Sequence, residues 1–316
     1  MTTEILATEK EFAEHIVIDV GDVAPEARRL SRKGLLLRRF LRNRIAVFGL
    51  VVYGLLVVLA IVGPLWISRW GYTEIDRGQY LQAPSKRHWL GTNQVGRDVF
   101  ALAMRGLGKS LIIGFCVGFF STAVAATVGS FAAYFRGWFE RVALWIIDLL
   151  LVMPSFVILA IILKNTKGSS SIWLLIVFLS IFSWMLTARV VRSVTMSVRD
   201  RDYVTAARYM GVPGWRIVFR HIVPNISSLL IVSFTLGVAG AVLGETALSY
   251  FGFGIRPPET SLGTLIGDGA RNATTFPWVF YAGAGFLLLM VLSVNFIGDG
   301  LRDALDPNSA KSGGHA

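Results

Sequence analysis

The run IAVFGLVVYGLLVVLAIVGPLWIS, from Ile45 to Ser68, decides the fold class of this chain because it contains no charged residue. A helix rises about 1.5 Å per residue, so about 20 apolar residues cross the roughly 30 Å hydrocarbon core of a bilayer. A helix also satisfies its own backbone hydrogen bonds, which lipid cannot do. The run therefore predicts a membrane-spanning helix.

Five further apolar runs have the length of a membrane span. The composition agrees, since 54% of the 316 residues are hydrophobic and 16% are charged, well outside the range of soluble proteins. We therefore predict an all-α polytopic membrane protein whose six transmembrane helices lie within residues 45–298. The five further runs are Ser110 to Phe135, Val142 to Leu163, Gly168 to Ala188, Ile222 to Gly244 and Asn272 to Gly298.

The Lys and Arg residues between the runs predict the orientation, because cytoplasmic loops carry the excess of these residues. When alternate loops are assigned to one side, that side has 20 Lys and Arg residues and the other has 10, with Lys109 left at a helix edge. The richer side includes the tails at 1–27 and 299–316. Both termini are therefore expected to be cytoplasmic.

The net charge of +11 raises the question of a nucleic-acid partner. The basic residues are densest at 28–44, where eight of them lie directly before the first span. They are interleaved with apolar residues such as Leu36 and Phe40. Such a segment rests its apolar face in the headgroup region while its cations meet anionic lipid. We predict a basic interfacial helix at 28–44 and no nucleic-acid partner.

The loop at 201–225 has the most specific sequence, RDYVTAARYMGVPGWRIVFRHIVPN. A helix-forming run begins at Tyr203, and Gly211 can supply the left-handed residue that closes a helix. Pro213 and Gly214 predict a turn, and the residues from Trp215 predict a second short helix. The loop is therefore expected to be a helical hairpin. Its apolar and small residues suit either a docking face or an amphipathic connector lying on the membrane.

The spacing of this loop resembles the signature loop of permease subunits from importers driven by ATP-binding cassette proteins. The shared order is Ala206-Ala207, three residues, Gly211, nine residues, and His221-x-x-Pro224; Thr205 stands where these permeases commonly have Glu. Three further segments, HWLGTNQVGRDVFALAMRG (88–106), GETALSYFGFGIRPPETSLG (244–263) and GDGLRDALDP (298–307), are similar to the second, C-type permease of the peptide and nickel branch. Asn93 replaces the usual Asp of the 88–106 segment.

The resemblance implies the transmembrane domain of a type I importer in a bacterial inner membrane, a non-catalytic subunit that imports di- or oligopeptides. It implies a second permease subunit, two ATPase subunits or domains that bind ATP and magnesium, and an extracytoplasmic binding protein. No cofactor or metal is expected on this chain. Nickel, glutathione and haem remain alternative cargoes, and an ion-coupled secondary transporter is the alternative class. The residues implied in ATPase coupling are Tyr203, Ala206, Ala207, Gly211, Pro213, Gly214, Trp215, His221, Pro224 and Asn225.

Other patterns have plainer interpretations. The string GLGKS at 106–110 imitates a phosphate-binding loop, but Ala103 occupies the position of its first glycine, so ATP binding here is not expected. A carboxylate in a membrane is costly and usually faces protein or water. Asp148 is therefore expected to bond structurally to a neighbouring helix. Glu245 is expected either at an outer gate or path or in a structural hydrogen bond.

Overall fold

A computed structural model describes residues 32–164 and 170–305. Within these residues the regular structure is helical, apart from one isolated bridge between Thr92 and Asp98, so the all-α prediction is confirmed. The chain divides into the units Met1–Arg38 and Arg39–Ala316, and the arrangement given below is that of the second unit. The predicted tail at 1–27, the start of the interfacial segment and residues 306–316 lie outside the described residues.

The first predicted span corresponds to α3 (Arg44–Val62) and η1 (Gly63–Ile67), and α2 (Arg32–Arg42) precedes it as a separate helix. Asn43 separates α2 from α3. Its Oδ1 accepts hydrogen bonds from the backbone N–H groups of Ile45 (3.1 Å) and Ala46 (3.2 Å), which caps α3. Its Nδ2 donates to Asp303 Oδ2 at 3.2 Å, so the cap also ties the start of α3 to the last helix.

The second span, α4 (Val99–Phe135), begins well before the predicted Ser110. Asp98 starts it, because its Oδ1 accepts a hydrogen bond from the N–H of Ala101 at 2.8 Å. Lys109, which the sequence placed at a helix edge, and Arg105, which it counted in the preceding loop, both lie within α4 and pair with Glu259 at 3.4 and 3.1 Å. The predicted boundary was wrong because these partners are distant in sequence.

The third and fourth predicted spans are each two helices. α5 (Gly137–Val152) and α6 (Ser155–Lys164) meet at 72°, and α7 (Ser170–Ser183) and α8 (Met185–Arg199) are bent by 42°. Pro154 explains the first break, since proline lacks an N–H and disfavours a helical residue before it. Four helices in the described part are long and apolar enough to span a membrane, or up to six if each bent pair counts as one span.

The fifth and sixth spans, α11 (Ser227–Tyr250) and α13 (Pro277–Leu305), begin and end later than predicted. The segment between them contains α12 (Leu262–Ala270), a helix that the sequence analysis did not predict. Ser261 caps α12: its Oγ accepts from the N–H of Thr264, whose hydroxyl accepts from the N–H of Ser261. This capping box needs no apolar run, which explains why hydropathy missed the helix.

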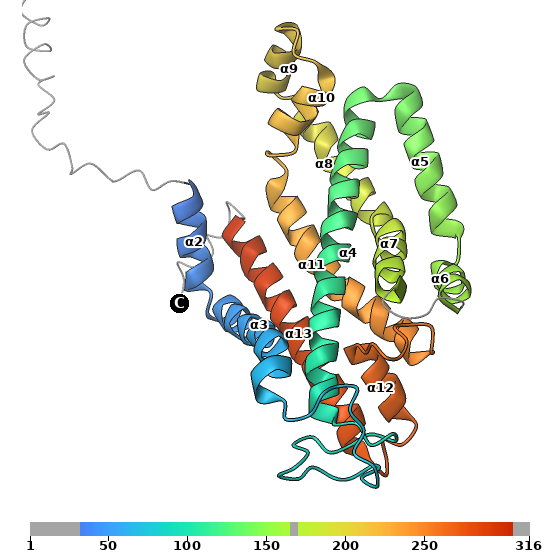
Figure 1. The fold of residues 1–316 in the computed structure, drawn as a ribbon. Helices are drawn as coiled ribbons and strands as arrows, with labels where there is room; N and C mark the ends of the chain where they lie inside the picture. The colour runs from blue at the N-terminus through green and yellow to red at the C-terminus, as the bar shows by residue number, and fades with distance from the viewer. Residues whose placement is uncertain (1–31, 165–169, 306–316) are drawn as a thin grey trace, which may run out of the picture. The chain divides into compact units, whose positions relative to one another are not determined.

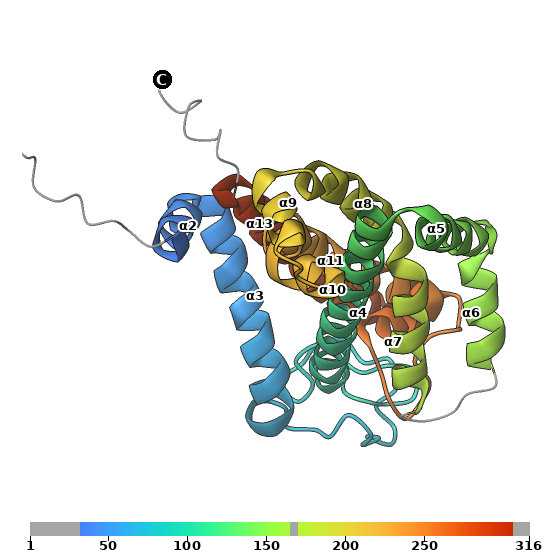
Figure 2. The ribbon, with the colours of Figure 1, turned by 90° about the horizontal axis from the view of Figure 1, so that it is seen from above.

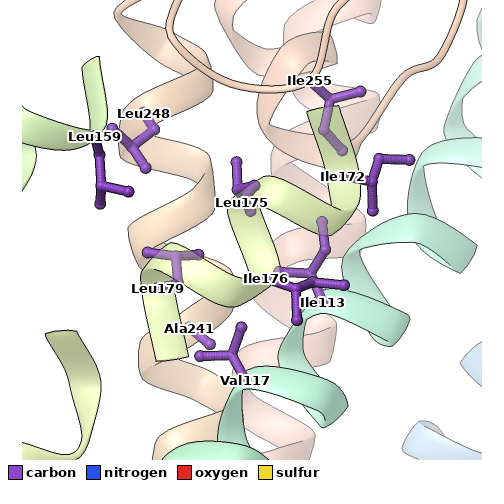
Figure 3. Close-up of a cluster of buried hydrophobic side chains, with 10 residues drawn as sticks. All are labelled: Ile113, Val117, Leu159, Ile172, Leu175, Ile176, Leu179, Ala241, Leu248 and Ile255. Carbon is purple, nitrogen blue, oxygen red and sulfur yellow. The ribbon is translucent and has the colours of Figure 1, made fainter. Parts of the chain in front are cut away.

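Helix α4 lies at the centre of the second unit, with α3 and α13 on one side and α5 to α8 on another (Figures 1 and 2). Small residues bring α4 close to α11: a Cβ added at Gly118 would lie 2.9 Å from Cγ2 of Val238. Figure 3 shows α7 residues packed against α4 and α11 in a cluster that includes Leu175, Ile113 and Leu248. At Gly240, also on α11, an added Cβ would meet no atom within 4 Å.

The two ends of this helical unit differ. The hairpin between α8 and α11 lies at the C-terminal end of α4, and we call this the α9 end (Figure 1). At the opposite end, Val99 and Leu102 of α4 pack with Leu265 of α12 and Val279 of α13. We call this the α12 end, and the 88–106 and 244–263 segments meet there, where Arg105 bonds to Glu259.

Candidate functional site

The loop at 201–225 forms the predicted helical hairpin at the α9 end. Its first helix is α9 (Asp202–Tyr209), and its second is α10 (Gly214–Ile217), which continues as the π-helical turn η2 (Val218–Ile222). The continuation carries the second helix through His221, as predicted, although with wider hydrogen-bond spacing.

Gly211 closes α9 in the left-handed conformation, with φ of +75°, as predicted. The N–H of Gly211 donates to the carbonyl of Arg208 at 3.0 Å, and the N–H of Val212 donates to the carbonyl of Ala207 at 3.2 Å. These two bonds form a Schellman motif, and Val212 packs in the same apolar cluster as Ala207, a contact that often accompanies the motif. The turn therefore depends on the conformation of one glycine.

A buried apolar cluster fixes the hairpin to the membrane helices. Val204 and Ile217 have no exposed surface and pack with Val191 of α8 and Ile226, which precedes α11. Gly214 lies against the end of α4, where an added Cβ would come within 2.8 Å of Cε1 of Tyr134. Any movement of the hairpin must therefore displace the ends of α4, α8 and α11, because close-packed side chains transmit strain.

The two alanines of the signature face opposite environments. Ala207 is 1% exposed and belongs to the buried cluster, whereas Ala206 is exposed. The expectation that both alanines present a docking surface was therefore wrong for Ala207. Val204 and Ala207 are three residues apart and share the inward face of α9. This side of α9 is buried because it packs against α8 and α10.

The outward face of the hairpin carries large exposed apolar side chains beside the exposed Arg208 and Arg216. Tyr209 is 87% exposed, Met210 is 76% exposed and Trp215 is 54% exposed. Pro213 and Gly211 lie beside them on the same exposed turn. Sequence analysis included Trp215 among the coupling residues but missed Tyr209 and Met210. No local pattern marked them, because Met210 lies three residues after the buried Ala207, a spacing that by itself predicts a shared face. We call the set of Ala206, Tyr209, Met210, Pro213 and Trp215 the hairpin face.

The two ends of the loop are joined directly. Nδ2 of Asn225 donates a hydrogen bond to Oη of Tyr203 at 2.5 Å. Pro224, next to Asn225, is exposed, and His221 is half-buried. The structure thus brings all ten predicted loop residues into one hairpin, but it separates those that face outward from those that hold the hairpin in place.

Two ion pairs join α5 to α8. Asp148 bonds to Arg189 of α8, and Glu140 accepts a hydrogen bond from Nε of Arg192 at 2.7 Å. Both arginines lie on α8, beyond Ala188, where the fourth predicted span ends. Asp148 therefore has a partner on a neighbouring helix, as the sequence analysis expected, and the Glu140 pair repeats the arrangement two turns away.

Glu245 lies at the α12 end of α11 and is fully buried, with 0% exposed. Its Oε1 accepts hydrogen bonds from Oγ of Ser249 at 2.5 Å and from Oγ of Ser261 at 2.6 Å. Because Ser261 also caps α12, the carboxyl group joins α11 to α12. This geometry is that of the structural hydrogen bond, one of the two alternatives left open by the sequence.

The 88–106 segment folds around a buried histidine. Nδ1 of His88 lies 2.8 Å from Asp98 Oδ2, its Nε2 lies 3.2 Å from Asp76 Oδ2, and Trp70 stacks on its ring. Residues 106–110, which imitate a phosphate-binding loop, lie within the helix α4 and so lack the loop geometry that cradles phosphate. Among the described residues, no group of three His, Cys, Asp or Glu side chains could hold a metal ion.

Comparisons with known proteins agree with this arrangement. The family described as binding-protein-dependent transport system inner membrane component matches residues 125–311, and the N-terminal transmembrane domain of oligopeptide transport permease C matches residues 31–84. The oligopeptide transport system permease protein OppC of Mycobacterium tuberculosis is 50% identical over 279 residues, which cover 88% of this chain and 96% of the relative.

A more distant relative and a solved structure extend the comparison. OppC of Bacillus subtilis is 33% identical over 307 residues, 96% of this chain and 98% of the relative. The MetNI methionine ABC transporter has a chain of the same fold, with a TM-score of 0.53 and 20% identity over 65% of this chain and 97% of that one. The chain therefore belongs to the inner membrane components of binding-protein-dependent transport systems, as a C-type permease of the oligopeptide branch of ATP-binding cassette importers.

Proposed function

We propose that this chain forms half of the translocation path of an oligopeptide importer and works by alternating access. A second permease subunit supplies the other half. Two ATPase subunits or domains bind ATP and magnesium at the α9 end, in the cytoplasm, and an extracytoplasmic binding protein delivers peptide at the α12 end. The excess of 20 basic residues against 10 on the side of the hairpin supports this orientation.

The observation that carries the proposal is the hairpin face. Tyr209 and Met210 are large apolar side chains that are 87% and 76% exposed at the tip of the hairpin. Exposed apolar patches of this kind mark sites where proteins or membranes bind, and we propose that a protein binds here. The opposite face of the same hairpin is buried against the ends of α4, α8 and α11. A partner bound to the hairpin face would therefore pass its movement directly to the membrane helices.

Closure of the ATPase subunits supplies that movement in the proposed cycle. The hairpin is short, its turn is fixed by two hydrogen bonds, and its ends are joined by Tyr203 and Asn225. Such an element shifts as a unit instead of absorbing displacement by bending. Helices α7 and α8, bent by 42°, connect the hairpin to the rest of the membrane domain. Relatives of this chain are named as oligopeptide permeases, which supports peptide as the cargo.

Replacement of the hairpin face tests docking. Tyr209→Glu with Met210→Glu should abolish copurification of the ATPase subunits and peptide uptake, because two charges would have to be desolvated in an apolar contact. Tyr80→Glu, on an exposed residue of the α12 end, is the matched control and should retain copurification of the ATPase subunits. If the double variant keeps its ATPase subunits and imports peptide at the parental rate, the hairpin face is not the docking surface.

Cysteine labelling tests the orientation. Cysteine at Ser85 should react with impermeant reagents in intact cells, and cysteine at Met210 should react only after lysis. Both positions are exposed, so accessibility within the chain does not confound the comparison. Labelling of the Met210 position in intact cells would contradict the proposed orientation.

A further inference from the structure

Two of the motif segments, 88–106 and 244–263, lie far apart along the chain and line one cavity. At the α12 end a pocket of about 200 Å³ opens between the turn at 91–98, the segment 249–260 and α12. We call it the motif pocket. Its charged and polar lining includes Asn93 and Arg97 from the first motif, Arg256, Glu259 and Thr260 from the second, and Asp268 from α12.

A closed turn fixes the backbone of Arg97 beside the pocket. The N–H of Asn93 donates to the carbonyl of Arg97 at 2.9 Å, and the N–H of Arg97 donates to Oδ1 of Asn93 at 2.9 Å. The amide oxygen of Asn93 thus does what the more usual Asp carboxylate can do at this position. Nε of Arg97 is buried and has no hydrogen-bond partner among the described residues. A buried donor without a partner is costly, so this guanidinium is poised to bind an acceptor from outside the chain.

The charges around the pocket leave an excess of positive charge. Glu259 is already occupied, since Arg105 donates to its Oε1 at 3.1 Å and Lys109 lies 3.4 Å from its Oε2. Burial raises the pKa of Glu259, but the hydrogen bond from Arg105 and the charges of Lys109 and Arg105 outweigh it and hold the pKa below the usual value. Of the acidic residues that line the pocket, Asp268 remains to balance Arg97 and Arg256, and the charge of Arg271 also acts on it.

The size of the pocket limits what it can take. It is far larger than the space that one water molecule needs, and smaller than the roughly 300 to 1,000 Å³ of sites that enclose a whole drug-sized ligand. The pocket therefore suits one end of a longer molecule. Arginine pairs with carboxylates through two parallel N–H donors, which makes a carboxylate the natural acceptor for Arg97 and Arg256.

We propose that the motif pocket binds the C-terminal carboxylate of the entering peptide, with Arg97 as the main contact and Arg256 at the rim. This inference rests on the proposed function, because it takes the α12 end to be the entry side of a peptide importer. It assigns the 88–106 and 244–263 segments a common role: they place two arginines around one anion site at the mouth of the path.

A cycle that combines variants of the chain with two peptides tests the inference. The complete transporter is reconstituted in vesicles, and uptake is measured for a short peptide with a free C-terminus and for the same peptide amidated. The binding protein is kept concentrated enough to be loaded with either peptide. Arg97→Gln and Arg256→Gln should each lower uptake of the free-acid peptide, by about tenfold for Arg97, mainly through KM. They should leave uptake of the amidated peptide nearly unchanged.

The quantity compared between variants is the ratio of free-acid uptake to amidated uptake. Any preference of the binding protein for one peptide affects this ratio equally in every variant, so it cancels. Arg77→Gln changes an exposed arginine of the same loop outside the pocket and should leave the ratio at its parental value. If the arginine variants lower uptake of both peptides equally, or of neither, the pocket does not recognise the carboxylate. If Arg97→Gln fails to assemble, Arg256→Gln decides the outcome. A parental transporter that imports neither peptide overturns the proposed function itself.

Discussion

Gly211 offers a perturbation whose cost can be worked out from the geometry. Its φ is +75° and no atom outside its own turn lies within 4 Å of an added Cβ. A side chain here meets backbone strain and no packing clash. The left-handed conformation costs an ordinary residue about 1 to 2 kcal/mol, and a β-branched residue is a strong outlier there. Asparagine tolerates this conformation much better.

Gly211→Val can respond in two ways. The turn stays strained, or it opens and loses the two hydrogen bonds from the N–H groups of Gly211 and Val212, each worth about 1 kcal/mol. Either cost is near the 1.4 kcal/mol that changes a population about tenfold. The docking conformation should therefore become rare, while α4, α8 and α11 remain packed.

Uptake and ATP hydrolysis, measured together on the reconstituted complex, check this reasoning. Gly211→Val should lower peptide uptake about tenfold or more, with ATPase subunits lost or hydrolysing without import. Gly211→Asn should stay close to the parent. Uptake at the parental rate by Gly211→Val would refute the role of the turn. Equal loss in both variants would show that the added side chain, and not the backbone conformation, matters.

Three further predictions follow from the packing. Ala207→Glu should unfold the hairpin and expose it to limited proteolysis, because a buried carboxylate costs several kcal/mol. Ala206→Glu should leave the hairpin folded and weaken only copurification of the ATPase subunits. Equal proteolysis of the two variants would contradict this division. Gly118→Leu should lower the thermal unfolding temperature, since overpacking costs about 1 to 3 kcal/mol, and Gly240→Leu, which meets no neighbour, should not. Lys109→Ala should leave nucleotide binding by the assembled complex unchanged, and loss of binding would show that residues 106–110 form a nucleotide site.

The existence and order of the spans could be predicted from apolar runs alone, but several of their ends could not. Hydropathy stops at charges, and α4 continues through Arg105 and Lys109 because Glu259 neutralises them from a distant loop. The break at Pro154 was readable from proline chemistry, yet the apolar run on both sides concealed it. The bend at Trp184 could not be predicted in this way, because no proline or glycine lies beside it in the sequence.

The hairpin shows the same division between local and tertiary causes. Gly211 and Pro213 determine a turn by their own conformational preferences, so the hairpin was predictable. Which alanine faces inward depends on where α8 and α10 lie, and no local pattern in Ala206-Ala207 encodes that. Exposure of Tyr209 and Met210 likewise follows from the fold. The motif pocket was beyond sequence analysis because its two halves lie more than 150 residues apart, at Arg97 and Arg256.

Cross-linking from the hairpin face tests the central claim most directly. Cys116, the only cysteine, is first replaced by Ser. Single cysteines are then placed at Met210 and, as a control, at Glu74. Glu74 is exposed and lies in the loop between η1 and α4, at the α12 end. A short thiol-directed photo-cross-linker on the assembled transporter should join the Met210 position to an ATPase subunit and leave the Glu74 position without such an adduct. Intact complexes in which the Met210 position gives no ATPase adduct would contradict the account.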